Sequence, residues 1–125
     1  MARVAVLCPD LLFGSKLEGG LRAAGHDVIR YEDEPNARAA DAEVLVVDLG
    51  AEDLDGATLV ESMQADGELD GLATLGFYPH VEQDTRARAE AVGFDLVVPR
   101  SRMAREMGVL VDRLAPGGGP GDRRG

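Results

Sequence analysis

Short apolar runs alternate along the chain with segments in which apolar residues recur at helical spacing. Five of the runs are rich in Val, Leu and Ala and have the length of β-strands. They cover residues 3–8, 26–31, 43–49, 72–78 and 95–98. The segments between them predict helices over residues 12–24, 35–40, 57–65 and 82–92, and a fifth helix with Ser101 as its N-cap that ends near residue 114.

This alternation predicts a parallel sheet covered by helices on both faces, since parallel strands need crossover connections. The run at residues 43–49 is almost continuously apolar, as expected for a strand buried on both faces. We therefore expect an α/β protein, a flavodoxin-like three-layer α/β/α sandwich whose five-stranded parallel sheet has the order 2-1-3-4-5. Residues 1–114 would form this domain. Residues 115–125 (APGGGPGDRRG) lack large apolar side chains and predict a disordered Gly/Pro-rich tail.

Charge and composition narrow the classes of partner. The net charge of −10 disfavours nucleic acid and anionic membranes, because phosphate contacts need a basic face. No segment has the length of a membrane span or of a secretory signal, so we expect a cytoplasmic protein. The single cysteine, Cys8, predicts a buried thiol, and His26, which follows a helix-ending glycine, is interpreted as a boundary residue.

Asp48 ends the central apolar run VLVVD and marks the expected site. Open parallel sheets bind ligands at the carboxyl ends of their strands, where the loops after residues 8, 48, 78 and 98 should meet. The side chains expected to line this edge beside Asp48 are Asp10, Tyr78, His80, Arg100 and Ser101. An ion pair between Arg100 and Asp48 is favoured over anion binding. His80 is interpreted as a loop or cap histidine, with a titrating or ligand-binding role as the alternative.

At this point the chain resembles the response-regulator receiver (CheY-like) domain family. The resemblance spans residues 3–114 and is carried by LRAAGHDV at 21–28, VVD at 46–48 and AVGFDLVVP at 91–99. It implies that Asp48 stands where receivers carry the aspartate that accepts a phosphoryl group. It also implies a Mg²⁺ ion, held in receivers by that aspartate and an acidic pair after the first strand.

The chain departs from the receiver pattern at the metal site. The acidic pair falls on Cys8 and Pro9, neither of which binds Mg²⁺. Asp10 lies one position further on, so Asp10 and Asp48 form at best a weak Mg²⁺ candidate.

It departs again at the positions that contact the phosphoryl group. The stretch LGFYPHV at 75–81 contains no Ser or Thr. The lysine position falls on Pro99, beside Arg100, and the aromatic switch position falls on Leu96.

These departures favour a degenerate pseudo-receiver: a non-enzymatic signalling or scaffold module, without a cofactor, that acts by phosphorylation-independent protein–protein interaction. The expected contact face comprises the fourth helix, fifth strand and fifth helix, and a homodimer is left open. The first alternative is an atypical phospho-receiver of two-component signal transduction, with Asp48 as phosphoacceptor and Mg²⁺ as cofactor. The second is a small-molecule or anion binder that uses Asp48, Tyr78, His80 and Arg100.

Overall fold

The computed structural model describes residues 1–79 and 83–116. Its strands are β1 (Arg3–Leu7), β2 (Asp27–Tyr31), β3 (Val44–Asp48), β4 (Ala73–Tyr78) and β5 (Leu96–Pro99). Its helices are α1 (Leu11–Ala23), α2 (Glu34–Arg38), α3 (Gly56–Ala65), α4 (Gln83–Val92) and α5 (Arg100–Leu114). The strands form one parallel sheet of order β2-β1-β3-β4-β5, which confirms the predicted fold class and strand order.

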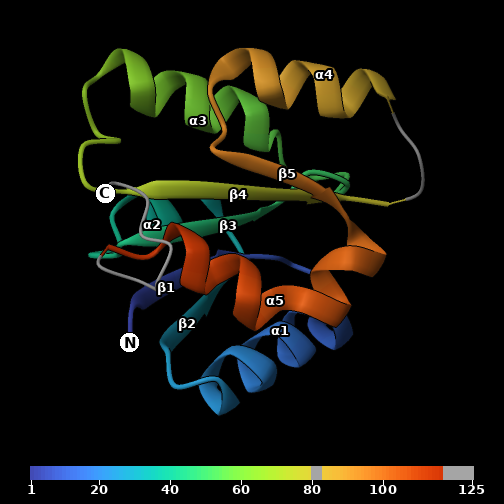
Figure 1. Ribbon diagram of the computed structural model, residues 1–125. Helices are drawn as coiled ribbons and strands as arrows, with labels where there is room; N and C mark the ends of the chain where they lie inside the picture. Colours follow the sequence, from blue (N-terminus) through green and yellow to red (C-terminus); the bar gives the residue numbers. More distant parts are fainter. Residues whose placement is uncertain (80–82, 117–125) are drawn as a thin grey trace.

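The helices form two layers, with α1 and α5 on one face of the sheet and α2, α3 and α4 on the other (Figure 1). Successive residues of β3 point to opposite faces, so Val44 and Val46 pack in the α1–α5 layer while Leu45 and Val47 pack in the other. All five β3 residues are buried. This two-sided burial explains why the run at 43–49 is almost continuously apolar.

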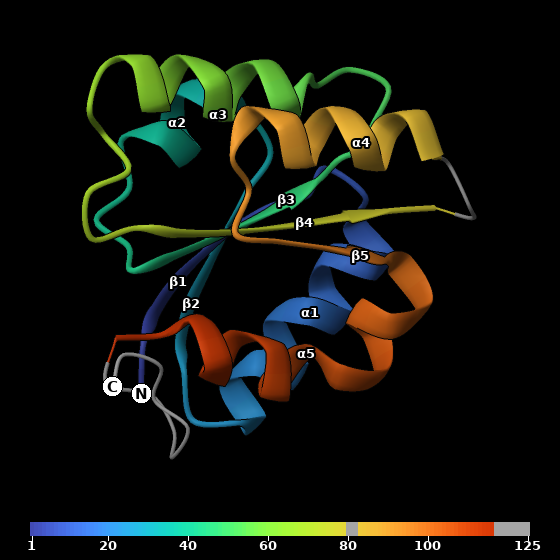
Figure 2. The same cartoon turned by 45° about the horizontal axis from the view of Figure 1, so that its top comes forward.

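Helices α1 and α5 approach each other closely because small residues lie between them. A Cβ atom on Gly20 would come within 2.4 Å of the Met107 sulfur, and one on Gly108 within 3.2 Å of the Ala24 side chain. Helix α5 is interrupted at Glu106, whose backbone is not helical (φ −122°, ψ 16°). The bend is visible in Figure 2.

Two expectations about local structure are wrong. Helix α5 begins at Arg100 with Pro99 as its N-cap and has no side-chain cap, so the exposed Ser101 is not the N-cap residue. His26 is more than a boundary residue: it is buried, its Nδ1 accepts the Ala2 N–H (3.1 Å), and its Nε2 lies 2.8 Å from an Asp112 carboxylate oxygen. His26 therefore ties the start of the sheet to α5.

Cys8 is fully buried, as predicted, and Lys16 is exposed on α1. In residues 1–79 and 83–116, no helix has both the length and the apolar character needed to cross a bilayer. The predicted tail lies for the most part outside the described residues, which end at Pro116.

Candidate functional site at the carboxyl edge of the sheet

Asp48 lies at the end of the central strand, beside Cys8 at the end of β1, and is enclosed. Only 4% of its surface is exposed. One carboxylate oxygen accepts the Gly50 N–H at 2.9 Å, and the other accepts the Cys8 thiol at 3.6 Å. Burial raises the pKa of Asp48, although the Gly50 N–H and the positive charge of Arg100 act in the opposite direction. Both oxygens therefore have partners inside the protein.

Cys8 presents a neutral thiol to Asp48. Burial, followed by the negative charge of Asp48, raises the pKa of the thiol to about 12. The thiol is thus a weak hydrogen-bond donor to the carboxylate. A protonated thiol is also a poor ligand for a hard cation, because Mg²⁺ prefers oxygen ligands.

Asp10 has two roles at the start of α1. One carboxylate oxygen caps the helix by accepting the N–H groups of Leu12 (3.0 Å) and Phe13 (3.2 Å). The other accepts a guanidinium N–H of Arg100 at 2.6 Å. The Phe13 N–H and then Arg100 hold the pKa of Asp10 below its ordinary value, so this carboxylate stays ionised.

The expected partner of Arg100 was Asp48, but its ion pair is with Asp10. Arg100 is the first residue of α5, and its guanidinium carbon lies 4.2 Å from the centre of the Phe13 ring. Phe13 in turn packs against Phe77 of β4, with ring centres 5.2 Å apart. Phe77 is the residue that pairs with Asp48 across β3 and β4. Two tilted aromatic rings therefore pack at this edge, with the guanidinium of Arg100 over the Phe13 ring and Phe77 paired in register with Asp48.

Arg30 is a site residue that sequence reasoning missed. It extends from β2 and donates a hydrogen bond to the main-chain oxygen of Cys8 at 2.8 Å. A Cβ atom on Gly14 would lie 2.6 Å from the Arg30 side chain, so α1 leaves room for the arginine by carrying a glycine there. Two features of the sequence could have indicated this contact: a charged residue within a short predicted strand, and a glycine early in the first predicted helix.

The other expected residues do not join this group. Tyr78 is buried in the opposite layer, on the α3–α4 side of the sheet. Ser101 is exposed in the first turn of α5. His80 lies outside the described residues, so its predicted place at this edge stays a prediction.

The residues present do not fit the Mg²⁺ ion that the resemblance implies. Both oxygens of Asp10 and both of Asp48 already accept hydrogen bonds from the protein. The strand-end position between them carries a thiol instead of a carboxylate. Within the described part of the chain, no three His, Cys, Asp or Glu side chains come together as a metal-binding group.

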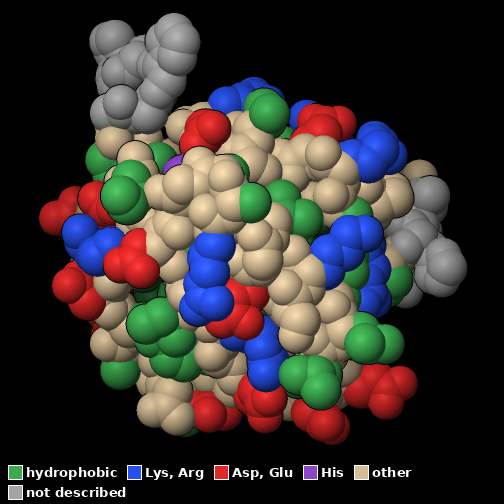
Figure 3. All heavy atoms as spheres, turned by 90° about the horizontal axis from the view of Figure 1, so that it is seen from below, with side chains coloured by type: hydrophobic (Ala, Val, Ile, Leu, Met, Phe, Trp, Pro, Cys, Tyr) green, Lys and Arg blue, Asp and Glu red, His purple; other side chains and the backbone are tan. Residues whose placement is uncertain are grey.

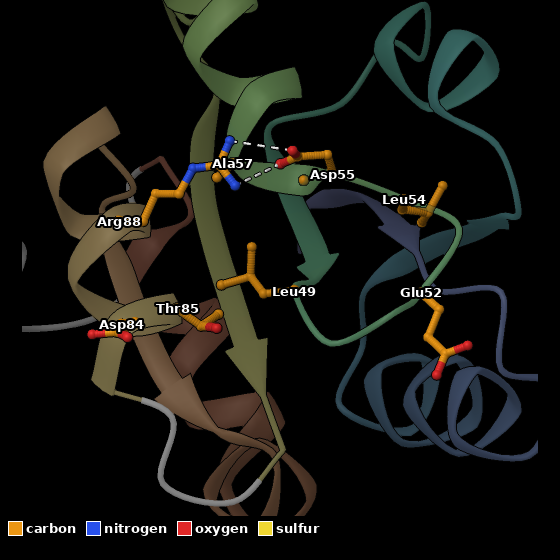
Figure 4. A pocket seen from close by; sticks show the side chains of 9 residues that line it. Leu49, Glu52, Leu54, Asp55, Ala57, Asp84, Thr85 and Arg88 are labelled. Atoms are coloured by element: carbon orange, nitrogen blue, oxygen red, sulfur yellow. Dashed lines mark hydrogen bonds and ion pairs between the residues drawn. The ribbon is translucent and has the colours of Figure 1, made fainter.

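A hollow of about 420 Å³ opens on the other side of the sheet edge, between the loop after β3 and helix α4 (Figure 4). Across it, Arg88 makes two contacts of 3.2 Å with the Asp55 carboxylate and donates a 2.6 Å hydrogen bond to the Thr58 hydroxyl. Asp55 is also the N-cap of α3, accepting the Thr58 N–H at 3.0 Å. This ion pair fixes the start of α3 to α4 and leaves the arginine engaged.

The sequence has no match among family models or curated proteins. Solved structures do match. The chain superimposes on the receiver domain of Francisella response regulator 1452 with a TM-score of 0.80 and 16% identity, covering 91% of this chain and 96% of that one. It matches Vibrio cholerae chemotaxis protein CheY4 with a TM-score of 0.79 and 17% identity, covering 91% and 98%.

A third match is a DNA-binding response regulator of the LuxR family from Staphylococcus aureus, with a TM-score of 0.80 and 8% identity over 91% of this chain and 98% of that one. Identities this low establish the fold alone. The chain has the fold of response-regulator receiver domains.

Proposed function

We propose that this chain is a signalling module with the receiver fold that acts by binding a protein partner, without phosphorylation of Asp48 and without catalysing a reaction. The observation that carries this proposal is the enclosure of Asp48. A carboxylate that accepts a phosphoryl group must be reachable by the donor and must have cations nearby to neutralise the phosphoryl oxygens. Asp48 is 4% exposed and faces a neutral thiol.

The cationic side chains near Asp48 are committed elsewhere. Arg100 pairs with Asp10 at 2.6 Å, and Arg30 donates to the Cys8 main-chain oxygen at 2.8 Å. Position 99 carries a proline, which contributes no charge. The edge thus lacks a free cation, among the described residues, that could meet an incoming phosphoryl group.

The surface that we propose for the partner comprises α4, β5 and α5. Strand β5 is the edge strand of the sheet, and α4 and α5 lie on either side of it (Figure 2). Helix α4 is mostly exposed, with Ala89 as its one fully buried residue in the described part of the chain. Because α4 contributes so little to the core, most of its side chains are exposed and could contact a partner.

A phosphorylation assay tests the first half of the proposal. The chain is incubated with acetyl phosphate and Mg²⁺ beside a receiver of proven activity, and intact mass is measured. We expect no added phosphoryl group while the reference receiver gains one. A phosphoryl gain that disappears in Asp48→Ala would show instead that the chain is an atypical phospho-receiver.

A cross-linking experiment tests the second half. A photoreactive amino acid is placed at Glu90 on α4 or, as the matched control, at Glu32 after β2, both of which are exposed. We expect a discrete cross-linked protein from position 90 alone, with equal yield in the Asp48→Ala background. A product that is lost with Asp48→Ala, or that forms equally from position 32, contradicts phosphorylation-independent binding through this surface.

A further inference from the structure

The start of α5 is joined to the start of α1 through one arginine. Arg100 contacts the Asp10 carboxylate at 2.6 Å and lies over the Phe13 ring at 4.2 Å. Asp10 is the N-cap of α1, and Phe13 lies in the first turn of the same helix. A single guanidinium thus contacts both a carboxylate and an aromatic face of α1, a pair of contacts that the planar, delocalised cation of arginine makes better than the ammonium of lysine.

This joint lies where the receiver resemblance implies a metal ion, and the carboxylates there already have partners within the protein. Asp10 would be the exposed carboxylate best able to attract a cation, but its remaining oxygen is taken by Arg100. The positive charge of Arg100 also acts against the rise that burial causes in the pKa of Asp48. The guanidinium therefore pairs directly with Asp10 and acts on the nearby Asp48 through its charge alone.

We propose that Arg100 is the resident cation of this edge, taking the place of a bound metal ion and clamping α5 to α1 permanently. This inference deepens the proposed function, because it names what holds the edge together without phosphorylation or metal. At the far end of the same two helices, His26 binds Asp112 at 2.8 Å. His26 follows the end of α1, so Asp112 joins the last turns of α5 to the start of the sheet, while the Gly20–Met107 contact lies between the two helices.

Apart from the contact of Arg100 with Asp10 and Phe13, the exposed face of the α1–α5 layer carries a mixture of side chains. Figure 3 looks onto that side and shows acidic and basic side chains intermingled, with apolar side chains scattered among them. Short ion pairs run along each helix, between Arg22 and Glu18 (2.9 Å) and between Arg102 and Glu106 (3.2 Å). These pairs lie within one helix, whereas the Arg100 pair joins two.

The test compares Arg100→Ala with Arg105→Ala, a matched removal of an exposed arginine whose ion pair is with the neighbouring Glu106. Amide NMR spectra are recorded with millimolar Mn²⁺, which broadens signals near a bound ion. In the wild type and in Arg105→Ala, we expect no selective broadening at residues 8–12 and 48–50. In Arg100→Ala, we expect selective broadening there that Mg²⁺ reverses by competition, since the carboxylates have lost their internal cation.

Selective broadening in the wild type equal to that in Arg100→Ala would overturn the inference, as would its absence in Arg100→Ala. Arg100→Lys is the second variant: it keeps the charge but loses the planar fork, and we expect it to exclude Mn²⁺ while shifting the Phe13 and Phe77 ring signals. Selective Mn²⁺ broadening at residues 8–12 and 48–50 in Arg100→Lys would also contradict the proposal of a resident cation. The wild-type phosphorylation assay is independent of these spectra, so failure of the clamp and failure of the proposed function are distinguishable.

Discussion

The Cys8 thiol and the Asp48 carboxylate face each other at 3.6 Å from the ends of two neighbouring strands. Both groups are buried, and burial raises the pKa of each, to about 12 for the thiol. The proton between them belongs to sulfur at neutral pH, because a carboxylate beside a thiol disfavours a second negative charge. Cys8, which stands where receivers carry an acidic residue, is therefore an uncharged neighbour of Asp48.

The first prediction concerns thiol reactivity. A thiol with a pKa of about 12 is almost entirely protonated at pH 8, and only the thiolate reacts quickly with disulfides or maleimides. We expect the folded chain to react with an aromatic disulfide reagent at least 100-fold more slowly than the same chain in denaturant, because a rise of the pKa from 9.0 to about 12 lowers the thiolate fraction at pH 8 by roughly 1,000-fold. Equal rates in the folded and unfolded states would show that the thiol is neither buried nor shifted.

The second prediction concerns the sign of the Asp48 charge effect. Because folding raises the pKa of Asp48, the protonated carboxyl group favours the folded state. This contribution to the free energy of unfolding is fully present below the ordinary pKa and is lost as pH rises through the pKa of the folded state. Asp48→Asn removes the buried charge, so we expect it to raise the free energy of unfolding at pH 7, with the gain shrinking as pH falls toward 4.

Asp10→Asn is the opposite control for that experiment. The folded state lowers the pKa of Asp10, so its stabilising effect is present above the ordinary pKa and is lost as pH falls through the folded value. Asparagine still caps the helix but no longer pairs its charge with Arg100. We expect Asp10→Asn to lower stability at pH 7, and chemical denaturation at several pH values gives both signs. Two variants that change stability in the same direction at pH 7 contradict this electrostatic arrangement.

The third prediction concerns the buried imidazole. His26→Phe fills similar space but leaves the Ala2 N–H without its acceptor and Asp112 without its partner. We expect a loss of about 1–3 kcal/mol in the free energy of unfolding, the usual cost of orphaning buried polar groups. Asp112→Asn, which keeps an acceptor for His26, should lose clearly less. A His26→Phe variant as stable as the wild type would restore the interpretation of His26 as a mere boundary residue.

The fourth prediction uses two adjacent glycines of α1. Nothing lies within 4 Å of a Cβ atom placed on Gly19, so Gly19→Ala should raise stability by about 1 kcal/mol through helix propensity. A Cβ atom on Gly20 meets the end of the Met107 side chain at 2.4 Å, so Met107 must move to make room for it. Thermal melts should therefore show that Gly20→Ala gains clearly less stability than Gly19→Ala. An equal gain in both variants would show that α1 and α5 are not packed as closely as the structure shows.

The sequence predicted the fold well because its signals are local and agree with one another. Apolar runs and helical periodicity placed each strand and helix to within a few residues, and the short connections allowed few topologies. Position 48 was identified for the same reason, since the end of a central strand is visible in the apolar run itself.

The partners of the charged side chains could not be predicted in the same way. Arg100 pairs with Asp10 rather than Asp48, and α5 starts two residues earlier than expected, with Pro99 instead of Ser101 as its N-cap. Arg30 and His26 bind groups 22 and 86 positions away in the chain, and no local pattern encodes such distances. Tyr78 was expected to line the edge beside Asp48 but packs in the opposite layer, because successive residues of a strand point to opposite faces.

An amide NMR titration of the wild-type chain with Mg²⁺, followed by beryllofluoride as a mimic of the phosphoryl group, tests the central claim most directly. If Asp48 is enclosed and its edge already holds its own cation, the signals of residues 8–12, 48–50 and 100–101 keep their positions through both additions. Saturable shifts concentrated at Asp10, Asp48 and Arg100 would contradict the account and identify the edge as a working phosphoryl site.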